Sequence, residues 1–191
     1  MILWLKARRV HVLVAPATLA FIVVVAVGYD QYVQLPSLLG SGGNRVFLVQ
    51  LAPVVITSAL AQSLAHRVPE IEKTARRNTR LLDSALITTT VAVAAMAVWA
   101  LGDASRSQEV LMAARNVVFL TGLMVLTRVL HEQAAVMAPV TWVFAVIFLG
   151  HRDPYRPWPW AVTLHPPGSL PTLALCLAVF GAGITAHVRH R

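Results

Sequence analysis

The chain has 191 residues, of which 57% are hydrophobic and 13% charged, and its formal net charge is +8. A soluble domain carries about 25% charged residues, so this composition excludes an ordinary water-soluble domain and favours a membrane protein. The basic residues lie at the ends of apolar runs, where they orient a protein in a membrane, and this placement argues against nucleic-acid binding.

The N-terminal stretch and the first apolar run predict a membrane entry and a first span. Trp4 and the basic residues Lys6, Arg8 and Arg9 are typical of a short amphipathic helix, with the basic side chains facing lipid phosphates. Residues 10–29 follow, and this run is long enough to cross ~30 Å of hydrocarbon at ~1.5 Å per residue. No small-residue cleavage site follows cleanly, so we expect a retained span and not a cleaved signal peptide.

The second span is predicted at residues 46–65, after a loop at 30–45 that is rich in turn-forming Pro, Gly, Ser and Asn. Pro53 lies inside this span and lacks a backbone donor, so we expect a kinked helix there. In a membrane such a kink persists only where neighbouring groups satisfy the freed carbonyl.

Residues 67–80 form the longest strongly charged stretch and lie between two apolar runs. The stretch predicts a cytoplasmic helix, because Pro69 suits a first helical turn and Glu70 and Glu72 lie where the helix dipole favours acids. Basic residues follow toward its end: Lys73, Arg76, Arg77 and Arg80. Two interpretations remain open: a helix that only fixes topology and binds anionic lipid headgroups, or a helix that docks a cytoplasmic partner.

The third and fourth spans are predicted at residues 82–101 and 110–130. Arg115 lies about one to two turns inside the fourth span, and an arginine within a span is a functional candidate by default. Because it is near the end of the span, the alternative is that its side chain extends to the membrane surface or pairs with Glu109 or Asp103.

The fifth and sixth spans are predicted at residues 134–150 and 170–188, and the fifth, which contains Pro139, is near the lower length limit for crossing. The connection 151–169 between them contains five prolines and the aromatic residues Tyr155, Trp158 and Trp160. Such side chains suit a membrane interface. The connection is therefore either an ordinary interfacial loop or an outer cap that dips back over a transport path.

Six spans place both termini on the same side of the membrane, and the Lys and Arg residues indicate which side. Eleven of them belong to the termini and to the loops after the second and fourth spans: Lys6, Arg8, Arg9, Arg67, Lys73, Arg76, Arg77, Arg80, Arg128, Arg189 and Arg191. Four belong to the opposite loops: Arg45, Arg106, Arg152 and Arg156. This asymmetry predicts that both termini lie in the cytoplasm. We expect one multi-pass domain, residues 1–191, in the plasma membrane.

Residues able to carry chemistry do not cluster in the sequence. The seven histidines are scattered, and no pair inside a span has the helical spacing of a metal site. Acidic residues are almost absent from span interiors, which argues against a proton-coupled carrier, an intramembrane protease and a lipid-modifying enzyme. No ATP-binding motif is present, so we expect no catalytic residue, metal or cofactor in this chain. Cys176 cannot form an internal disulfide and is predicted to be an apolar packing residue.

The layout of the chain resembles the membrane subunits of ATP-binding-cassette exporters of the type-2 permease family. The shared features are six spans with both termini inside, an amphipathic N-terminus, a charged cytoplasmic helix between spans two and three, and an aromatic loop between spans five and six. The segment from Pro69 to Arg77 is similar to the coupling helix of that family. The segment after span five is similar to its re-entrant outer helices.

This resemblance implies a transport function. A separate cytoplasmic ATPase would bind ATP and Mg²⁺ and dock on residues 70–80, while two copies of this chain, or this chain and a related one, would enclose the path. Candidate path residues are Pro53, Pro139, Arg115, Trp158 and Trp160. The passenger would be amphipathic or apolar, because the spans offer few polar groups. The alternative is a non-transporting membrane partner, such as a sensor, assembly factor or regulatory subunit, that docks a cytoplasmic protein through the same 67–80 helix.

Overall fold

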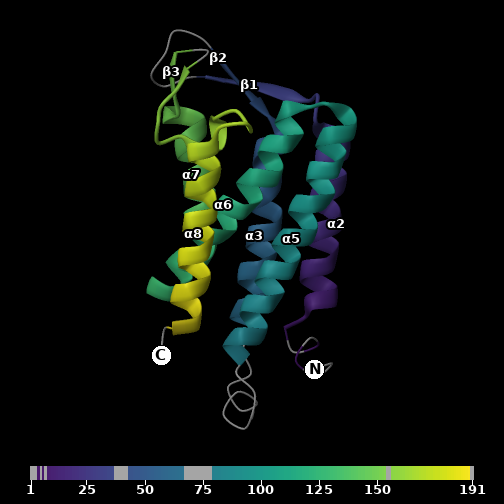
Figure 1. Cartoon of the computed structure of the whole chain (residues 1–191), viewed down its shortest axis with the longest axis vertical. Helices are drawn as coiled ribbons and strands as arrows, with labels where there is room; N and C mark the ends of the chain where they lie inside the picture. The colour runs from purple at the N-terminus through teal and green to yellow at the C-terminus, as the bar shows by residue number, and fades with distance from the viewer. Residues whose placement is uncertain are drawn as a thin grey trace.

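The computed structural model describes residues 4, 6, 8–36, 43–66, 79–153 and 156–189. Within this part of the chain, six long α-helices stand side by side in an elongated bundle (Figure 1). They are α2 (Val10–Gly28), α3 (Leu48–Ala65), α5 (Thr79–Ser105), α6 (Gln108–Leu130), α7 (Ala134–Leu149) and α8 (Leu170–Arg189). Successive helices run in opposite directions, so the start of α2 and the end of α8 lie at the same end, here called the terminal end.

Each of the six apolar runs predicted from the sequence forms a helix, which confirms the helical bundle. Five helices are long and apolar enough to cross a membrane: α2, α3, α5, α6 and α8. The remaining helix, α7, has 16 residues and extends over only ~24 Å at ~1.5 Å per residue. It is therefore shorter than a typical ~30 Å hydrocarbon layer. These lengths and compositions indicate a membrane protein.

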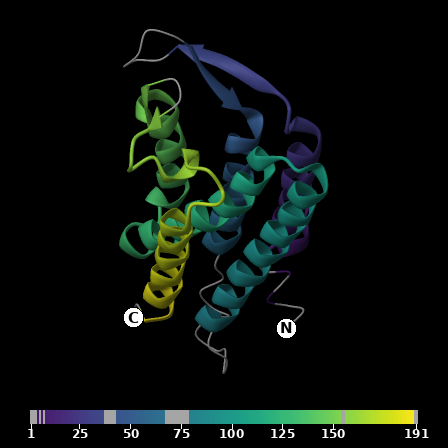
Figure 2. The same cartoon turned by 45° about the horizontal axis from the view of Figure 1, so that its top comes forward.

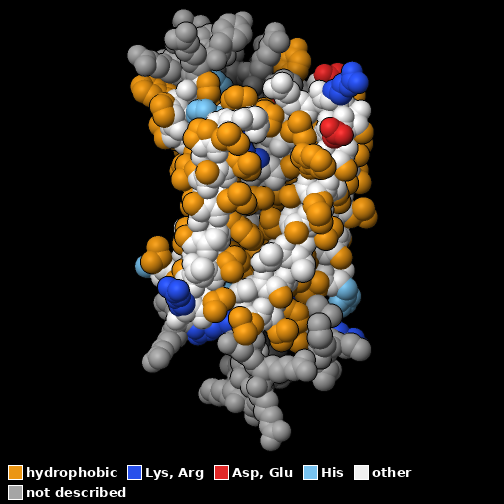
Figure 3. Space-filling view, in the orientation of Figure 1, with side chains coloured by type: hydrophobic (Ala, Val, Ile, Leu, Met, Phe, Trp, Pro, Cys, Tyr) orange, Lys and Arg blue, Asp and Glu red, His pale blue; other side chains and the backbone are white. Residues whose placement is uncertain are grey.

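The outer surface of the bundle is apolar between its two ends. Figure 3 shows hydrophobic side chains over most of this face, with charged side chains gathered toward the ends. On α2, for example, Val12, Leu19 and Val27 are more than half exposed, whereas Phe21 and Val25 on its other face are fully buried. Large apolar side chains exposed in this number are unfavourable in water, and lipid is the solvent that suits them.

Helix α6 lies at the centre and packs against α3, α5, α7 and α8. Its contact with α8 is unusually close because glycines face one another. A Cβ atom added to Gly122 would lie 2.6 Å from the Cα atom of Phe180, and one added to Gly183 would lie 2.9 Å from the carbonyl oxygen of Gly122. Small residues at a helix crossing let two backbones meet in this way.

Two short antiparallel hairpins lie at the opposite end, here called the hairpin end (Figures 1 and 2). One pairs β1 (Tyr32–Pro36) with β2 (Gly43–Phe47), and the other pairs β3 (His151–Asp153) with β4 (Arg156–Pro157). The first hairpin corrects the sequence interpretation of residues 30–45, which predicted a loop only.

The connection from β4 to α8 folds back onto the hairpin end of the bundle (Figure 2). It contains one turn of 3₁₀ helix, η1 (Val162–Leu164). Ala161, Val162 and Thr163 are buried, so this part is packed between helices and is not a loop in solvent.

Candidate functional site

Arg115 lies two turns inside α6 and is only 5% exposed. Its guanidinium group binds carbonyl oxygens of the connection between β4 and α8. Nη1 donates to Pro166 at 3.0 Å, and Nη2 donates to Val162 at 3.0 Å and to His165 at 2.8 Å. The side-chain oxygens of Thr172 (3.3 Å) and Asn116 (3.4 Å) complete the set.

The neighbouring Asn116 extends this network. Its Nδ2 atom donates to the carbonyl oxygen of Thr163 at 3.0 Å. Two adjacent side chains of α6 therefore donate to four carbonyl groups of the connection between β4 and α8. Irregular backbone at membrane depth needs such partners, because lipid supplies none. The pair explains how the connection folds back into the bundle.

The structure corrects one sequence interpretation of Arg115. The side chain was expected either to extend to the surface or to pair with Glu109 or Asp103. It does neither: it points into the bundle, and no carboxylate pairs with it in the part of the chain that the structure describes. Its charge is stabilised by neutral oxygens instead, among them the carbonyl oxygens of Val162 and His165. The Nε atom is buried without a hydrogen-bond partner.

A lateral pocket lies beside Arg115, between α5, α6 and α8. Its volume is about 500 Å³, and it is lined by Ala95, Met96, Trp99, Leu111, Ala114, Arg115, Val118, Pro167, Gly168 and Leu173. Arg115 is the one charged residue among them. Met96 and Trp99 are about 60% exposed, so the pocket opens on the apolar outer face. Figure 3 shows a basic side chain within the otherwise apolar surface between α8 and α5. Below, this space is called the lateral pocket.

The tryptophans of the connection are at the same end as Arg115, and Trp160 contacts α7. The ring of Trp160 lies edge-on to Trp142 of α7, with centroids 6.1 Å apart, and Trp142 lies 5.1 Å from Phe119 of α6. Trp158 and Trp160 are both partly exposed, at 37% and 39%. This side of the connection forms an aromatic anchor, and neither tryptophan lines the lateral pocket.

The two candidate prolines lie far from one another along the bundle. Pro53 is buried near the hairpin end of α3, and Pro139 is buried near the terminal end of α7. Neither lines the lateral pocket. The structure thus brings Arg115, Trp158 and Trp160 to one end and does not join them to the prolines.

A second polar cluster holds the terminal end together. Arg8 Nη2 lies 2.7 Å from Asp83 Oδ2, and both side chains are at most 5% exposed. Arg8 Nη1 also donates to the carbonyl oxygens of Leu64 (2.8 Å) and His66 (3.2 Å), and Ser63 Oγ donates to the carbonyl oxygen of Arg8 (2.7 Å). Arg8 was expected to face lipid phosphates, and this expectation is wrong, because its charge is paired inside the bundle.

Arg128 at the end of α6 joins the same cluster. Its Nη2 atom donates to the Leu64 carbonyl oxygen at 2.7 Å and to Glu132 Oε1 at 2.8 Å, and Nη1 donates to the Ala61 carbonyl oxygen at 3.3 Å. The last carbonyls of a helix lack intrahelical partners and carry partial negative charge. Two arginines from distant parts of the chain therefore cap the end of α3. The cluster of Arg8, Asp83 and Arg128 is called the terminal cluster below.

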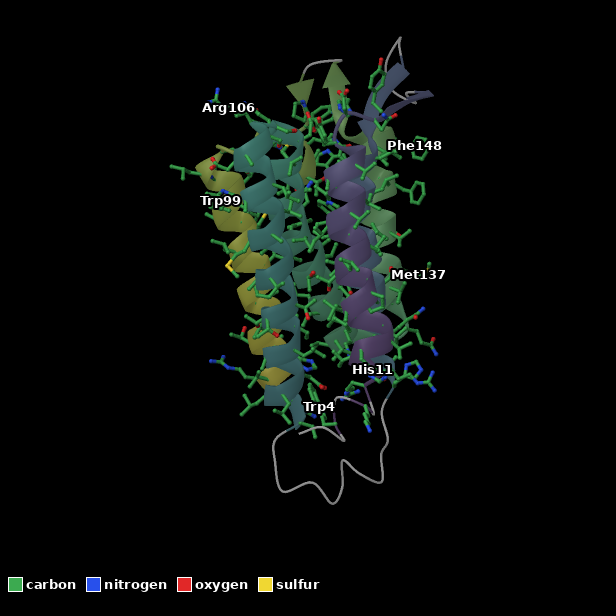
Figure 4. All side chains as sticks on the ribbon, turned by 90° about the vertical axis from the view of Figure 1, so that its right-hand side faces the viewer. Trp4, His11, Trp99, Arg106, Met137 and Phe148 are labelled. Atoms are coloured by element: carbon green, nitrogen blue, oxygen red, sulfur yellow. The ribbon has the colours of Figure 1, made fainter. Side chains whose placement is uncertain are left out.

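The predicted docking helix is only partly described. Pro69, Glu70, Glu72, Lys73, Arg76 and Arg77 lie outside the described residues, and Arg80 is in the first turn of α5. The described chain ends at His66 before this segment and resumes at Thr79 after it. His66 and Asp83, which flank the segment, are both bound by Arg8. The terminal cluster thus fixes the points where the charged segment leaves and rejoins the bundle (Figure 4, near Trp4).

One further expectation concerns Cys176, which lies within the described residues. Cys176 is fully buried and packs in an apolar cluster with Phe119, Leu120 and Ile147, as predicted for a packing residue. Among the described residues, no group of three His, Cys, Asp or Glu side chains is placed to hold a metal ion.

Comparisons with protein-family models, with curated proteins and with solved structures gave no match for this chain. The functional conclusion therefore depends on the geometry described above.

Proposed function

We propose that this chain is the membrane subunit of an ATP-binding-cassette exporter, in which a separate cytoplasmic ATPase docks on residues 67–80. The observation that carries the proposal is the terminal cluster, which connects both ends of this charged segment to the helices of the bundle. The ATPase binds ATP and Mg²⁺, and the membrane subunit provides the path for an amphipathic or apolar substrate.

The proposed topology has six spans with both termini in the cytoplasm. It is supported by the alternating direction of the helices and by the excess of Lys and Arg at the terminal end. In this topology helix α7 is the fifth span and α8 the sixth. The 16 residues of α7 are fewer than the ~20 of a typical span, and a locally thinner bilayer accommodates such a helix at modest cost.

Coupling follows from how the charged segment is attached. The segment joins α3 to α5, and both helices pack against α6. When the ATPase pair closes, it displaces residues 67–80. Because Arg8 binds His66 on one side and Asp83 on the other, the displacement passes to both helices together and not to a loose loop. Coupling of the ATPase to the bundle needs such a rigid attachment, because conformational changes pass between sites through packed elements that can adopt two arrangements.

The test is purification of the tagged protein in mild detergent, with gentle crosslinking and mass spectrometry of the proteins that accompany it. A stoichiometric soluble ATPase is the expected result. A preparation that repeatedly lacks an ATPase contradicts the exporter and leaves a docking partner of another kind.

Charge reversal then locates the contact. The triple variant Arg76→Glu, Arg77→Glu, Arg80→Glu should insert normally and lose the ATPase. Arg189→Glu is the matched control, because Arg189 is an exposed basic residue at the same end but outside the charged segment. If the triple variant retains the ATPase, residues 67–80 are not the docking site.

A further inference from the structure

We propose that the lateral pocket is a binding site for an anionic lipid, whose acyl chain lies against Met96, Trp99 and Leu173 and whose negative group is held by the charge of Arg115. This inference goes beyond the proposed function. It requires a bilayer around the bundle and does not require an ATPase.

Arg115 carries a positive charge inside an apolar bundle, and an ionised group is costly there unless it is paired. Its hydrogen-bond acceptors are all neutral oxygens, and within the described residues no carboxylate pairs with it. One donor, Nε, has no acceptor among the described residues. The described residues therefore provide hydrogen-bond acceptors for Nη1 and Nη2 but no negative charge. A negative group is consequently favoured in the adjoining pocket.

The lateral pocket has a suitable size and opens toward the bilayer. The volume of about 500 Å³ is within the range of small-molecule sites. Apart from Arg115, the lining is apolar side chains together with Pro167 and Gly168 of the connection. The exposed Met96 and Trp99 place the opening on the face that lipid covers (Figure 3). A ligand reaching this opening comes from the bilayer, and an acyl chain fits its walls.

The net charge of the headgroup determines which lipids Arg115 favours. A zwitterionic headgroup has no net charge, whereas an anionic lipid supplies the charge that Arg115 lacks. A basic residue near a membrane surface raises the affinity for an anionic lipid about fivefold. Arg115 is ~10 Å along α6 from Gln108. The negative group of the bound lipid therefore lies deeper in the bilayer than the headgroups of the surrounding lipids.

Two glycines provide a matched pair of variants. A Cβ atom added to Gly168 or to Gly181 meets no atom within 4 Å, and neither residue has a positive φ angle. Leucine is therefore accommodated at both positions. Gly168 lines the lateral pocket and Gly181 does not. We expect Gly168→Leu to occupy part of the pocket while every residue that binds Arg115 is kept, whereas Gly181→Leu adds the same side chain on the exposed face of α8.

The experiment is native mass spectrometry of the delipidated full chain, titrated with phosphatidylglycerol, with phosphatidylcholine of the same acyl chains, or with inorganic phosphate. We expect phosphatidylglycerol to bind at least about fivefold more strongly than phosphatidylcholine. Gly168→Leu should lose this binding, and Gly181→Leu should retain it. Arg115→Gln should bind the two lipids equally; should this variant fail to fold, Gly168→Leu alone decides.

Three results would overturn the inference. Equal binding of the two lipids to the unmodified chain would remove the role of charge. Full binding by Gly168→Leu would place the lipid outside the lateral pocket. Competition by inorganic phosphate alone would identify a site for a free anion. Failure of this inference is separate from failure of the exporter, since the purified chain is measured without an ATPase.

Discussion

Arg8 Nη2 lies 2.7 Å from Asp83 Oδ2 and the two side chains are almost completely buried, so the segment before α2 is paired directly with the first turns of α5. The two residues are 75 positions apart in sequence. Arg8 also binds the end of α3. One side chain thus connects three parts of the bundle at the end where the charged segment is attached.

Removing one member of this pair should be strongly destabilising. Asp83→Asn removes the carboxylate that pairs with the buried Arg8 guanidinium group, and breaking a buried pair in this way costs about 3 kcal/mol or more. We expect the thermal midpoint of the detergent-solubilised protein to fall by roughly 10 °C. Asp103→Asn is the control, since Asp103 is exposed near the other end of the same helix. The double variant Arg8→Met, Asp83→Leu should recover part of the loss, and a midpoint unchanged by Asp83→Asn would contradict the structural role of the pair.

The glycine contact between α6 and α8 predicts opposite effects for two similar substitutions. Gly183→Ala places a Cβ atom 2.9 Å from the Gly122 carbonyl oxygen, so the helices must separate, at a cost of about 1–3 kcal/mol. Gly181→Ala meets open space and should be neutral or stabilising by up to about 1 kcal/mol, because alanine is the better helix former. Thermal unfolding of the two variants, side by side, measures the difference. Equal midpoints would show that the two helices do not meet through their backbones.

Asn116 should be essential for the position of the connection between β4 and α8. Asn116→Leu removes the donor to the Thr163 carbonyl oxygen and leaves a buried acceptor unpaired, at a cost of about 1–3 kcal/mol. We expect faster amide hydrogen exchange in residues 161–166 with little change in α2. Thr89→Val is the control, because the exposed Thr89 hydroxyl donates only within its own helix. Unchanged exchange in 161–166 would mean that Asn116 does not hold this segment.

The helices of this chain could be predicted from its sequence, whereas the polar contacts between them could not. Each apolar run is continuous in sequence and bounded by charged, polar or turn-forming residues, so its range is local information; α3, for instance, is Leu48–Ala65 where 46–65 was predicted. The partners of Arg115 are 47 to 57 residues away, apart from its neighbour Asn116, and they are mostly backbone carbonyls, which carry no sequence signal. The only hint was an arginine inside an apolar run. The lateral pocket depends on how three helices are spaced, which no local pattern encodes.

His151 should make stability depend on pH in a defined direction. It lies in β3, outside the long helices, and burial lowers the pKa of its imidazole below the ordinary value. The folded protein therefore binds a proton at His151 less readily than the unfolded chain does. Above the ordinary pKa both states are neutral and the residue has no effect. As the pH falls from about 7 toward about 5, the unfolded chain takes up the proton first, so the free energy of unfolding decreases.

His151→Gln removes this dependence and keeps a polar side chain of similar length. We expect the variant to lose less stability than the unmodified protein between about pH 7 and about pH 5, measured by thermal unfolding in the same detergent. His11→Gln is the matched control, because His11 is exposed near the terminal end (Figure 4). The comparison with His11→Gln separates the effect of His151 from the effect of replacing one of the seven histidines in general. Parallel profiles for His151→Gln and the unmodified protein would show that His151 is as accessible to protons in the folded state as in the unfolded one.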